Sequence, residues 1–511
     1  MKYTLFPDQK IWCRATVDAL TRGSDGQPAF DRVLSVAATG AGKTIMSSAL
    51  AEWSCKTGQG KTLFLADSDE LVNQAIDKIF KSTGMIAGKE KASSHASRTR
   101  DVVVGSIQTL AQQHRLETWD PDHFGLVIAD EAHLSMSDSW QRVLKHFTPA
   151  KQVGVTATPE RADERDLWNY WQHEAANISL FELIDLGRLS PIRVQTCPID
   201  LNCRGIKASG QGLNEEELSH RIEPAFDAII EAWKRYGEGR KTLWFLPGVA
   251  ASKVFAEKLR RAGLTAKHVD GASKDRQQIL KGYEDGEFEH LTNAQLLMKG
   301  YDCPDIGAVV ILRPTKSRVA YQQMVGRGTR VCDRYTDMLL LDFLWDFDKL
   351  MVRPADLIAK NKQQADAIQR RFTGTDEQLD IREAAELAHI DAVKKLIDRL
   401  TTGDKRTART YTAHQAAALM GEQGLLDYEP RAGWEIEKPS QKQLDVLKAE
   451  GIQSRTVKTK GEASQLIGRI GRRKGHGQAD IQQLLELHRL GAENPLEFTK
   501  DAAGRAIEAN I

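Results

Sequence analysis

Short apolar runs separated by helical stretches predict two parallel β-sheets in the first two thirds of the chain. Leu126–Ala129 is an uninterrupted apolar run of strand length, and Thr242–Leu246 and Ala308–Leu312 repeat the pattern further on. Between such runs, Ile45–Trp53 and Ala251–Ala262 carry apolar residues at helical spacing. Strands that alternate with helices are typical of α/β domains with a parallel sheet. We therefore expect two such domains in tandem.

The last third of the chain has a helical pattern instead. Residues 355–371 and 381–400 are rich in Ala, Leu, Glu, Gln and Lys at helical periodicity. A shift of 40 residues then superimposes two later segments without a gap, matching Gln443, Leu444, Leu447, Gly451, Thr459, Lys460, Ala463 and Ile467 with Gln483, Leu484, Leu487, Gly491, Thr499, Lys500, Ala503 and Ile507. This self-similarity predicts two copies of a helix–turn–helix pair, whose first helices are capped at Ser440 and Asp480.

Composition limits the kind of partner that the chain can hold. Its 511 residues contain 71 Lys and Arg against 70 Asp and Glu, so a nucleic acid would have to be bound by a local groove rather than by net charge. The six cysteines are scattered without zinc spacing and read as reduced thiols. We expect no secretion signal in Met1–Trp12 and no membrane span, because no apolar run approaches about 18 residues. A cytoplasmic protein of a bacterium or a phage-infected host is predicted.

A glycine-rich turn between the first strand and a helix has the form of a phosphate-binding loop. The turn contains Thr39, Gly40, Ala41 and Gly42, and Lys43 and Thr44 follow it. Glycines let backbone N–H groups approach phosphates closely, and the helix N-terminus adds a positive dipole end. Lys43 would reach the β- and γ-phosphates and the Thr44 hydroxyl would hold Mg²⁺. The turn therefore predicts binding of a nucleoside triphosphate.

An acidic pair follows the apolar run Leu126–Ala129. Asp130 and Glu131 would stand at the carboxyl edge of the sheet, where ligands bind in open α/β folds. Asp130 would complete the Mg²⁺ shell, and Glu131 would orient and deprotonate the attacking water.

Together with Thr156-Ala157-Thr158 and Gln323–Arg330, these motifs occur in the order found in superfamily 2 helicases of the DEAD/DEAH type. The chain is most similar to the branch that holds the XPB-like DNA helicases, the motor subunits of type I and type III restriction enzymes, and phage branch-migration helicases. The resemblance covers roughly residues 1–350. It implies two RecA-like domains, at 1–189 and 190–352, that bind ATP and Mg²⁺. A helical connector at 353–436 and the repeat at 437–511 are expected to follow.

The resemblance assigns roles to further residues. Gln9 would read the adenine edge, with Phe6 stacking on the base, and Asp302 would approach the ribose. His133, Thr156 and Thr158 would couple hydrolysis to strand movement. The residues implied to contact a nucleic-acid backbone are Asp69, Ser106, Gln108 and Thr109, together with Lys299, which replaces a glutamate usual in the family.

The arginines of the last motif carry the sharpest expectation. Arg327 and Arg330 lie three residues apart, on what we expect to be the first turns of a helix, with Gln323 before them. Both guanidinium groups could then reach across a cleft to the γ-phosphate and neutralise charge that develops in the transition state.

Residues 451–475 are the most basic stretch of the chain. Arg472, Arg473 and Lys474 lie within it, and its only acidic residue is Glu462. It is interpreted equally well as a sequence-independent phosphate grip or as a solvated linker.

The motifs together predict an ATP- and Mg²⁺-dependent DNA helicase or translocase that acts on single-stranded, duplex or branched DNA. The alternatives are an RNA helicase, a motor subunit of a restriction or defence complex that needs partner subunits, and an ATP-switched binding protein without processive movement.

Overall fold

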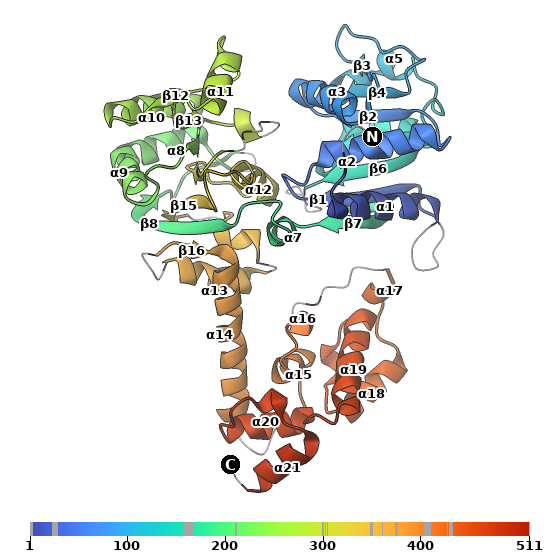
Figure 1. Ribbon diagram of the computed structural model, residues 1–511, viewed down its shortest axis with the longest axis vertical. Helices are drawn as coiled ribbons and strands as arrows, with labels where there is room; N and C mark the ends of the chain where they lie inside the picture. Colours follow the sequence, from blue (N-terminus) through green and yellow to red (C-terminus); the bar gives the residue numbers. More distant parts are fainter. Residues whose placement is uncertain are drawn as a thin grey trace. The chain divides into compact units, whose positions relative to one another are not determined.

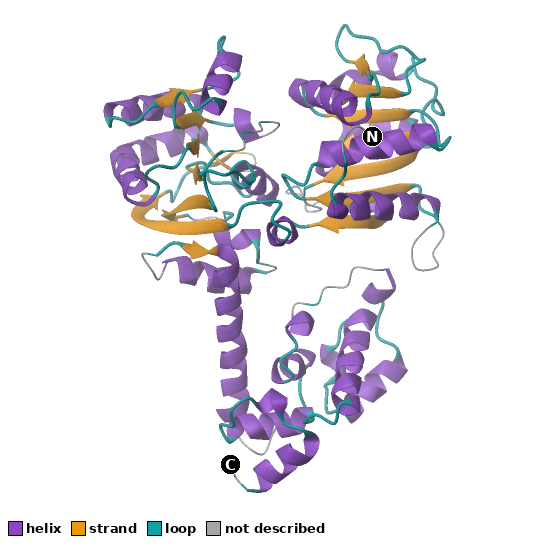
Figure 2. Ribbon diagram, viewed as in Figure 1, coloured by secondary structure: helices purple, strands orange, loops and turns teal. Residues whose placement is uncertain are grey.

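The computed structural model describes residues 4–22, 29–157, 167–209, 212–298, 301, 303, 305–347, 351–359, 361–373, 377–402, 410–426, 428 and 433–509. The chain divides into two compact units, Met1–Ala384 and Ala385–Ile511, which are described separately below. Figure 1 shows two sheets flanked by helices in the first unit and an all-helical second unit, and Figure 2 separates the two kinds of element by colour. No helix in these residue ranges is both long and apolar enough to cross a membrane.

The first sheet is seven-stranded and every neighbouring pair in it is parallel. Its strand order is β3-β4-β2-β5-β6-β1-β7. The strands are β1 (Arg32–Ala37), β2 (Thr62–Ala66), β3 (Gly88–Glu90), β4 (Val102–Ser106), β5 (Leu126–Asp130), β6 (Lys151–Thr156) and β7 (His173–Ile178). Strands buried on both faces read as continuous apolar runs, which is why β5 could be predicted.

Helices cover both faces of this sheet because successive side chains of a strand point to opposite sides. Val33 packs with Leu50 of α2 on one face, and Leu34 packs with Trp140 of α6 on the other. The helices are α1 (Pro7–Thr21), α2 (Lys43–Lys56), α3 (Asp69–Thr83), α4 (Ile107–Leu110), α5 (Gln113–Leu116), α6 (Asp138–His146) and α7 (Leu180–Asp185), with 3₁₀ turns at Ala132–Leu134 and Leu167–Asn169. Two apolar cores therefore hold the carboxyl edge of the sheet in place.

The second sheet has the order β12-β13-β11-β14-β15-β8-β16, and its strands are parallel except for β16. The strands are β8 (Ile192–Asn202), β11 (Thr242–Phe245), β12 (Ala266–His268), β13 (His290–Asn293), β14 (Ala308–Ile311), β15 (Met338–Asp346) and β16 (Leu379–Asp380); β9 (Ala208–Ser209) and β10 (Gly212–Leu213) form a separate ribbon. The tandem α/β fold expected from the sequence is thus confirmed.

The helices of this second half are α8 (Glu215–Ile222), α9 (Phe226–Tyr236), α10 (Val249–Arg261), α11 (Arg276–Glu284), α12 (Arg318–Val325) and α13 (Lys362–Thr373), with 3₁₀ turns at Glu223–Ala225, Leu296–Met298 and Pro354–Leu357. Helices α8, α9 and α10 bury one face of the sheet, where Phe226, Phe255 and Trp244 share a core. Helix α14 (Ile381–Thr402) runs across the boundary between the two units.

The second unit consists of α15 (Ala413–Leu419), α16 (Gln423–Leu426), α17 (Gly433–Ile436), α18 (Gln441–Ala449), α19 (Lys460–Gly475), α20 (Ile481–Arg489) and α21 (Lys500–Glu508), with 3₁₀ turns at Ser454–Thr456 and Pro495–Glu497. The helix pairs that the repeat predicts are therefore present, as α18–α19 and α20–α21.

The two copies of the repeat share their supporting contacts as well as their helices. Gln443 completes a capping box with Ser440 and also donates from Nε2 to the Lys460 carbonyl at 3.3 Å. In the second copy, Gln483 completes a capping box with Asp480 and donates to the Lys500 carbonyl at 2.9 Å. One glutamine in each copy thus ties the start of the first helix to the start of the second. The domain boundaries expected at 189, 352 and 436 stay predictions.

Candidate active site

Three neighbouring strands of the first sheet deliver the candidate catalytic residues to its carboxyl edge. The glycine-rich loop follows β1, Asp130 ends β5, and Thr156 ends β6, while the strand order places β6 between β5 and β1. In parallel sheets this edge is where ligands bind.

The glycine-rich loop adopts a backbone that requires glycine. Gly40 and Gly42 have φ values of 93° and 86°, in the left-handed region that other residues rarely occupy. A Cβ at Gly42 would lie 2.6 Å from Gln9 Nε2, so a side chain there would have to displace the end of Gln9. Helix α2 begins at Lys43, with Thr44 next to it, and Lys43 Nζ donates to the Ala37 carbonyl at 3.3 Å. The loop thus presents backbone N–H groups and one cation at the start of a helix.

The acidic pair is buried and is held in a strained conformation. Glu131 has a φ of 55°, which is uncommon for a residue with a side chain, and its N–H donates to Asp130 Oδ1 at 3.1 Å. Burial, and next the charge of Glu131, raise the pKa of Asp130. Two buried carboxylates disfavour each other's ionised form and would gain from a cation, and hard oxygen ligands suit Mg²⁺. The oxygen donors of Thr44 and Asp130 are therefore of the kind that suits this ion.

His133 lies between the acidic pair and β6. Its Nδ1 is 3.2 Å from Glu131 Oε2 and 3.4 Å from Thr156 Oγ1. The structure thus brings together two of the three residues expected to couple hydrolysis to movement. Thr158, the third, lies outside the described residues.

Residues between β14 and β15 of the second sheet meet the first sheet at this point. Gln323 Nε2 lies 3.5 Å from Glu131 Oε1, and a Cβ at Gly326 would lie 2.8 Å from the Thr39 side chain. Burial lowers the pKa of Lys43, while Glu131 and Asp130 oppose this effect and Arg327 and Arg330 add to it. The ammonium group thus lies within electrostatic range of both carboxylates and both arginines.

The expectation that the two arginines lie in the first turns of a helix is wrong. Helix α12 ends at Val325, with Gln323 in its last turn, and Arg327 and Arg330 follow it. The backbone at Gly328 is pressed against β14 and β15, since a Cβ there would lie 2.6 Å from Met338 and 2.7 Å from Val309. Arg327 donates to the Tyr301 carbonyl. Close packing at glycine, rather than a helix, therefore sets the positions of the arginines.

Gln9 is engaged by the protein itself. Its Nε2 donates to the Ala41 carbonyl at 2.8 Å, and its Oε1 accepts from the Phe6 N–H at 3.1 Å. The side chain therefore fastens the start of α1 to the glycine-rich loop, and recognition of a base by Gln9 stays a prediction.

The residues expected to contact a nucleic-acid backbone follow β2 and β4, which are neighbours in the sheet. Ser106 Oγ donates to Gln108 at 2.7 Å, Thr109 Oγ1 accepts from the Ala92 N–H at 3.0 Å, and Asp69 pairs with Lys91. These polar groups thus gather at one part of the carboxyl edge. Lys299 and Asp302 lie outside the described residues.

The basic stretch of the second unit forms α19 and the loop before it. Arg473 donates to the Ala479 carbonyl at 3.2 Å, and Lys474 pairs with Glu450. Arg472 is exposed, as are Arg455 and Lys458 in the loop. Two of the three basic residues singled out from the sequence thus make contacts within the unit.

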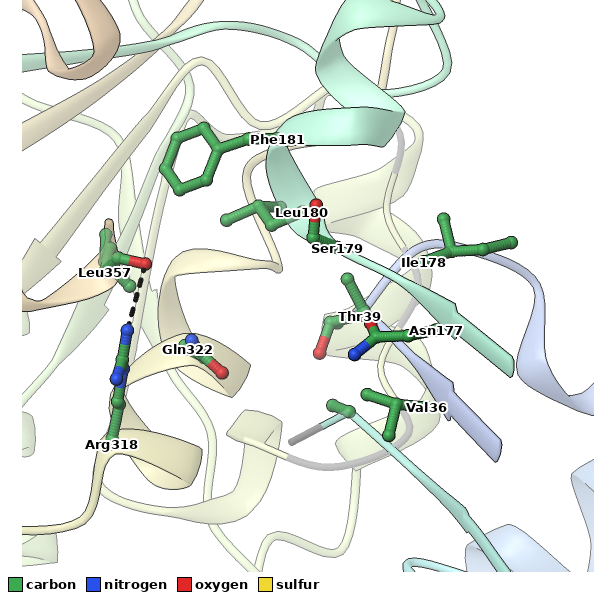
Figure 3. Close-up of a pocket in the computed structure, with 12 residues that line it drawn as sticks. Val36, Thr39, Asn177, Ile178, Ser179, Leu180, Phe181, Arg318, Gln322 and Leu357 are labelled. Atoms are coloured by element: carbon green, nitrogen blue, oxygen red, sulfur yellow. Dashed lines mark hydrogen bonds between the residues drawn. The ribbon is translucent and has the colours of Figure 1, made fainter. Parts of the chain in front are cut away.

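A cavity of about 200 Å³ lies beside the glycine-rich loop, and the sequence did not indicate it. Figure 3 shows Thr39 and Val36 on one side, Ser179 to Phe181 at the start of α7, and Arg318 and Gln322 on α12. Arg318 Nη2 donates to the Leu357 and Ala359 carbonyls at 3.5 and 3.2 Å. The cavity thus lies where the loop, the connection between the sheets and α12 meet.

Two family models match the chain. Residues 2–161 match the model described as type III restriction enzyme, res subunit, and residues 224–332 match the helicase conserved C-terminal domain. The first match contains the glycine-rich loop and the acidic pair, and the second contains Gln323, Arg327 and Arg330.

Individual proteins give a similar picture. The Saccharomyces cerevisiae protein named "Putative ATP-dependent helicase IRC3" is 28% identical over 329 residues, which are 60% of this chain and 47% of that protein. The Escherichia coli type I restriction enzyme EcoAI endonuclease subunit is 28% identical over 377 residues, 64% of this chain and 44% of its own. The chain thus spans less than half the length of these two relatives.

Among solved structures, the ATP-dependent type ISP restriction-modification enzyme LlaBIII bound to DNA shares the fold. Its TM-score is 0.55 at 15% identity, and the match covers 99% of this chain and 42% of that one. At this identity the likeness concerns the fold alone.

Proposed function

Because the chain belongs to the superfamily 2 helicases and carries their ATP-hydrolysing core of two parallel-sheet domains, we propose that it couples ATP hydrolysis to movement along DNA or to remodelling of DNA. Branched DNA is included among the substrates that we propose. The protein would act in the cytoplasm of a bacterium or of a phage-infected host.

The observation that carries the proposal is the meeting of both sheets at one site. Gln323 contacts Glu131, and both arginines influence the pKa of Lys43. In the proposed reaction Lys43 binds the terminal phosphates, Asp130 and Thr44 hold Mg²⁺, and Glu131 orients and deprotonates the attacking water. Mg²⁺, when bound, would offset the negative charge of the phosphates.

Arg327 and Arg330 would neutralise the charge that develops on the transferred phosphoryl group. Because they come from the second half of the fold, the site is complete only while the two sheets are together at this edge. Hydrolysis and release would then change how the halves meet. In this proposal the contact between His133 and Thr156, 3.4 Å long, would pass such a change along the first sheet.

The test is the steady-state ATPase rate without polynucleotide and with single-stranded DNA, duplex DNA, forked or four-way DNA, and RNA. We expect strong stimulation by DNA, greatest with a branched form. Stimulation by RNA alone would contradict DNA as the substrate. An ATPase rate no higher than that of Glu131→Gln would refute ATP hydrolysis at this site.

A second candidate function is a motor subunit of a restriction or defence assembly. The match to the EcoAI endonuclease subunit, which covers 64% of this chain, favours it. In that case ATP turnover would stay low with every polynucleotide and would rise when partner subunits are supplied.

The exposed basic residues of the first repeat copy would add a grip on the DNA backbone. Changing Arg455, Lys458 and Arg472 together to Gln is expected to weaken binding to duplex DNA at low salt and to reduce the salt slope of log Kd by about 3, since each lost phosphate contact removes roughly 0.9. Basal ATPase activity should stay unchanged. Fluorescence anisotropy across a salt series measures both quantities.

The control is Lys500→Gln with Arg505→Gln in the second copy, which removes two exposed positive charges from α21 where the test variant removes three from the first copy. We expect this control to bind DNA as the wild type does. An equal loss for each charge removed in both variants would indicate a general charge effect rather than a grip by the first copy.

A further inference from the structure

Three consecutive residues connect three separate parts of the candidate active site. Arg188, Leu189 and Ser190 follow α7 and lead into β8, the first strand of the second sheet. Their contacts span the start of α1, the glycine-rich loop and the segment that carries Arg327 and Arg330. None of the three belongs to a motif that the sequence indicated.

Arg188 lies against the start of α1. Its guanidinium carbon is 3.4 Å from the centroid of the Phe6 ring, and Nη1 donates to Asp8 Oδ1 at 2.8 Å. The plane of the guanidinium group is thus fixed by an aromatic ring and a carboxylate, both at the start of α1, while 17% of the side chain stays exposed. Gln9, the next residue of α1, fastens this end to the glycine-rich loop.

Leu189 lies against the glycine-rich loop. A Cβ at Gly40 would be 2.6 Å from Leu189 Cδ2, so the leucine packs directly on the backbone of the glycine-rich loop. Only 1% of Leu189 is exposed, and it belongs to the apolar core that also contains residues of α2. A shift of Leu189 would therefore displace the backbone of the loop.

Ser190 holds the segment that carries the arginines. Its N–H donates to the Thr329 carbonyl at 2.8 Å, and its Oγ donates to the Arg330 carbonyl at 3.0 Å. Leu189 and Arg330 also form an isolated antiparallel bridge. The backbone of Arg330 is thus fixed by the two residues that follow Arg188.

We propose that the Arg188 guanidinium is the platform on which the nucleobase stacks, and that Leu189 and Ser190 convey base occupancy to Arg330. A guanidinium group is planar and stacks on aromatic faces, and here it is held in place before the base arrives. Phe6 then supports Arg188 from behind instead of meeting the base itself. The inference rests on the proposed function, because it assumes a nucleoside triphosphate in this site.

The first experiment measures equilibrium binding of a fluorescent ADP analogue, mant-ADP, to the full-length protein. Arg188→Ala is expected to weaken binding about tenfold, the size typical of a stacking cation at a partly buried site. Arg188→Lys should lose nearly as much, because an ammonium group keeps the charge near Asp8 but has no planar face. Inorganic tripolyphosphate, which has no base, should compete equally well in wild type and Arg188→Ala.

The matched variant is Ser190→Ala. It should bind mant-ADP as the wild type does and lower kcat about fivefold with KM unchanged, because it loses one hydrogen bond to the arginine segment. A thermal melt of each variant completes the comparison. A merely structural role of these residues would instead lower Tm and weaken binding of mant-ADP and tripolyphosphate alike.

Two results would overturn the inference while leaving the proposed function intact. Tighter binding of mant-ADP by Arg188→Ala would mean that the guanidinium occupies the place of the base, and unchanged binding would mean that it does not touch the base. By contrast, a wild type that binds mant-ADP but hydrolyses no ATP would refute the proposed function alone. A wild type that binds no mant-ADP would refute both.

Discussion

Arg327→Ala and Arg330→Ala are each expected to lower ATP turnover by about 10³-fold or more while leaving nucleotide binding nearly intact. An arginine that reaches the γ-phosphate is worth roughly 10³ to 10⁵ in rate, because it stabilises charge present only in the transition state. The segment that carries them already meets the site, because a Cβ at Gly326 would lie 2.8 Å from the Thr39 side chain. Single-turnover hydrolysis and mant-ADP titration measure the two effects separately.

The control is Arg334→Ala, which removes a nearby arginine that pairs with Glu289. This variant should hydrolyse ATP at close to the wild-type rate. Normal turnover in both Arg327→Ala and Arg330→Ala would exclude the proposed role of the arginines. Equal loss of binding and turnover would instead indicate that they support the bound nucleotide in its ground state.

Glu131→Gln is expected to reduce hydrolysis by about 10²- to 10⁴-fold, the range typical of a lost general base, with ATP still bound. Glutamine keeps the length of the side chain and can still meet Gln323, but it cannot take a proton from water. The variant should therefore accumulate on DNA in the ATP-bound state. Filter binding with labelled ATP, together with a turnover assay, tests this outcome.

Asp138→Asn is a suitable comparison, because Asp138 lies in the first turn of α6 rather than at the sheet edge. It should leave turnover unchanged. If Glu131→Gln hydrolysed ATP normally, the attacking water would have to be deprotonated by another group, and the role assigned to Glu131 would be wrong.

Much of the fold could be predicted because its signals are local. The apolar run before Asp130 is a strand buried on both faces, and Gly40 and Gly42 have the backbone conformations that glycine makes possible. The caps Ser440 and Asp480 likewise begin helices through contacts three residues away. In each case the residues that cause the structure are neighbours in the chain.

The rest of the site depends on contacts that the sequence does not display. The arginines follow α12 where Gly328 packs against Val309 of β14 and Met338 of β15, contacts that no local pattern around Gly328 displays. Arg188 meets Asp8 across 180 residues, and Ser190 meets Arg330 across 140. No periodicity or motif marks such pairs, so the linkage through residues 188–190 could be found only in the folded chain.

The two repeat copies share the glutamine contacts that join their helices but differ in the charged residues of their loops. Gln443 and Gln483 make the same two connections, whereas the loops between the helices carry Arg455 and Lys458 in one copy and Glu493 and Glu497 in the other. Because the glutamine scaffold does not depend on loop charge, a loop can be exchanged without rebuilding its helices. The duplicated unit is thus a frame in which the surface charge of one copy can differ from that of the other while the helices keep the same contacts.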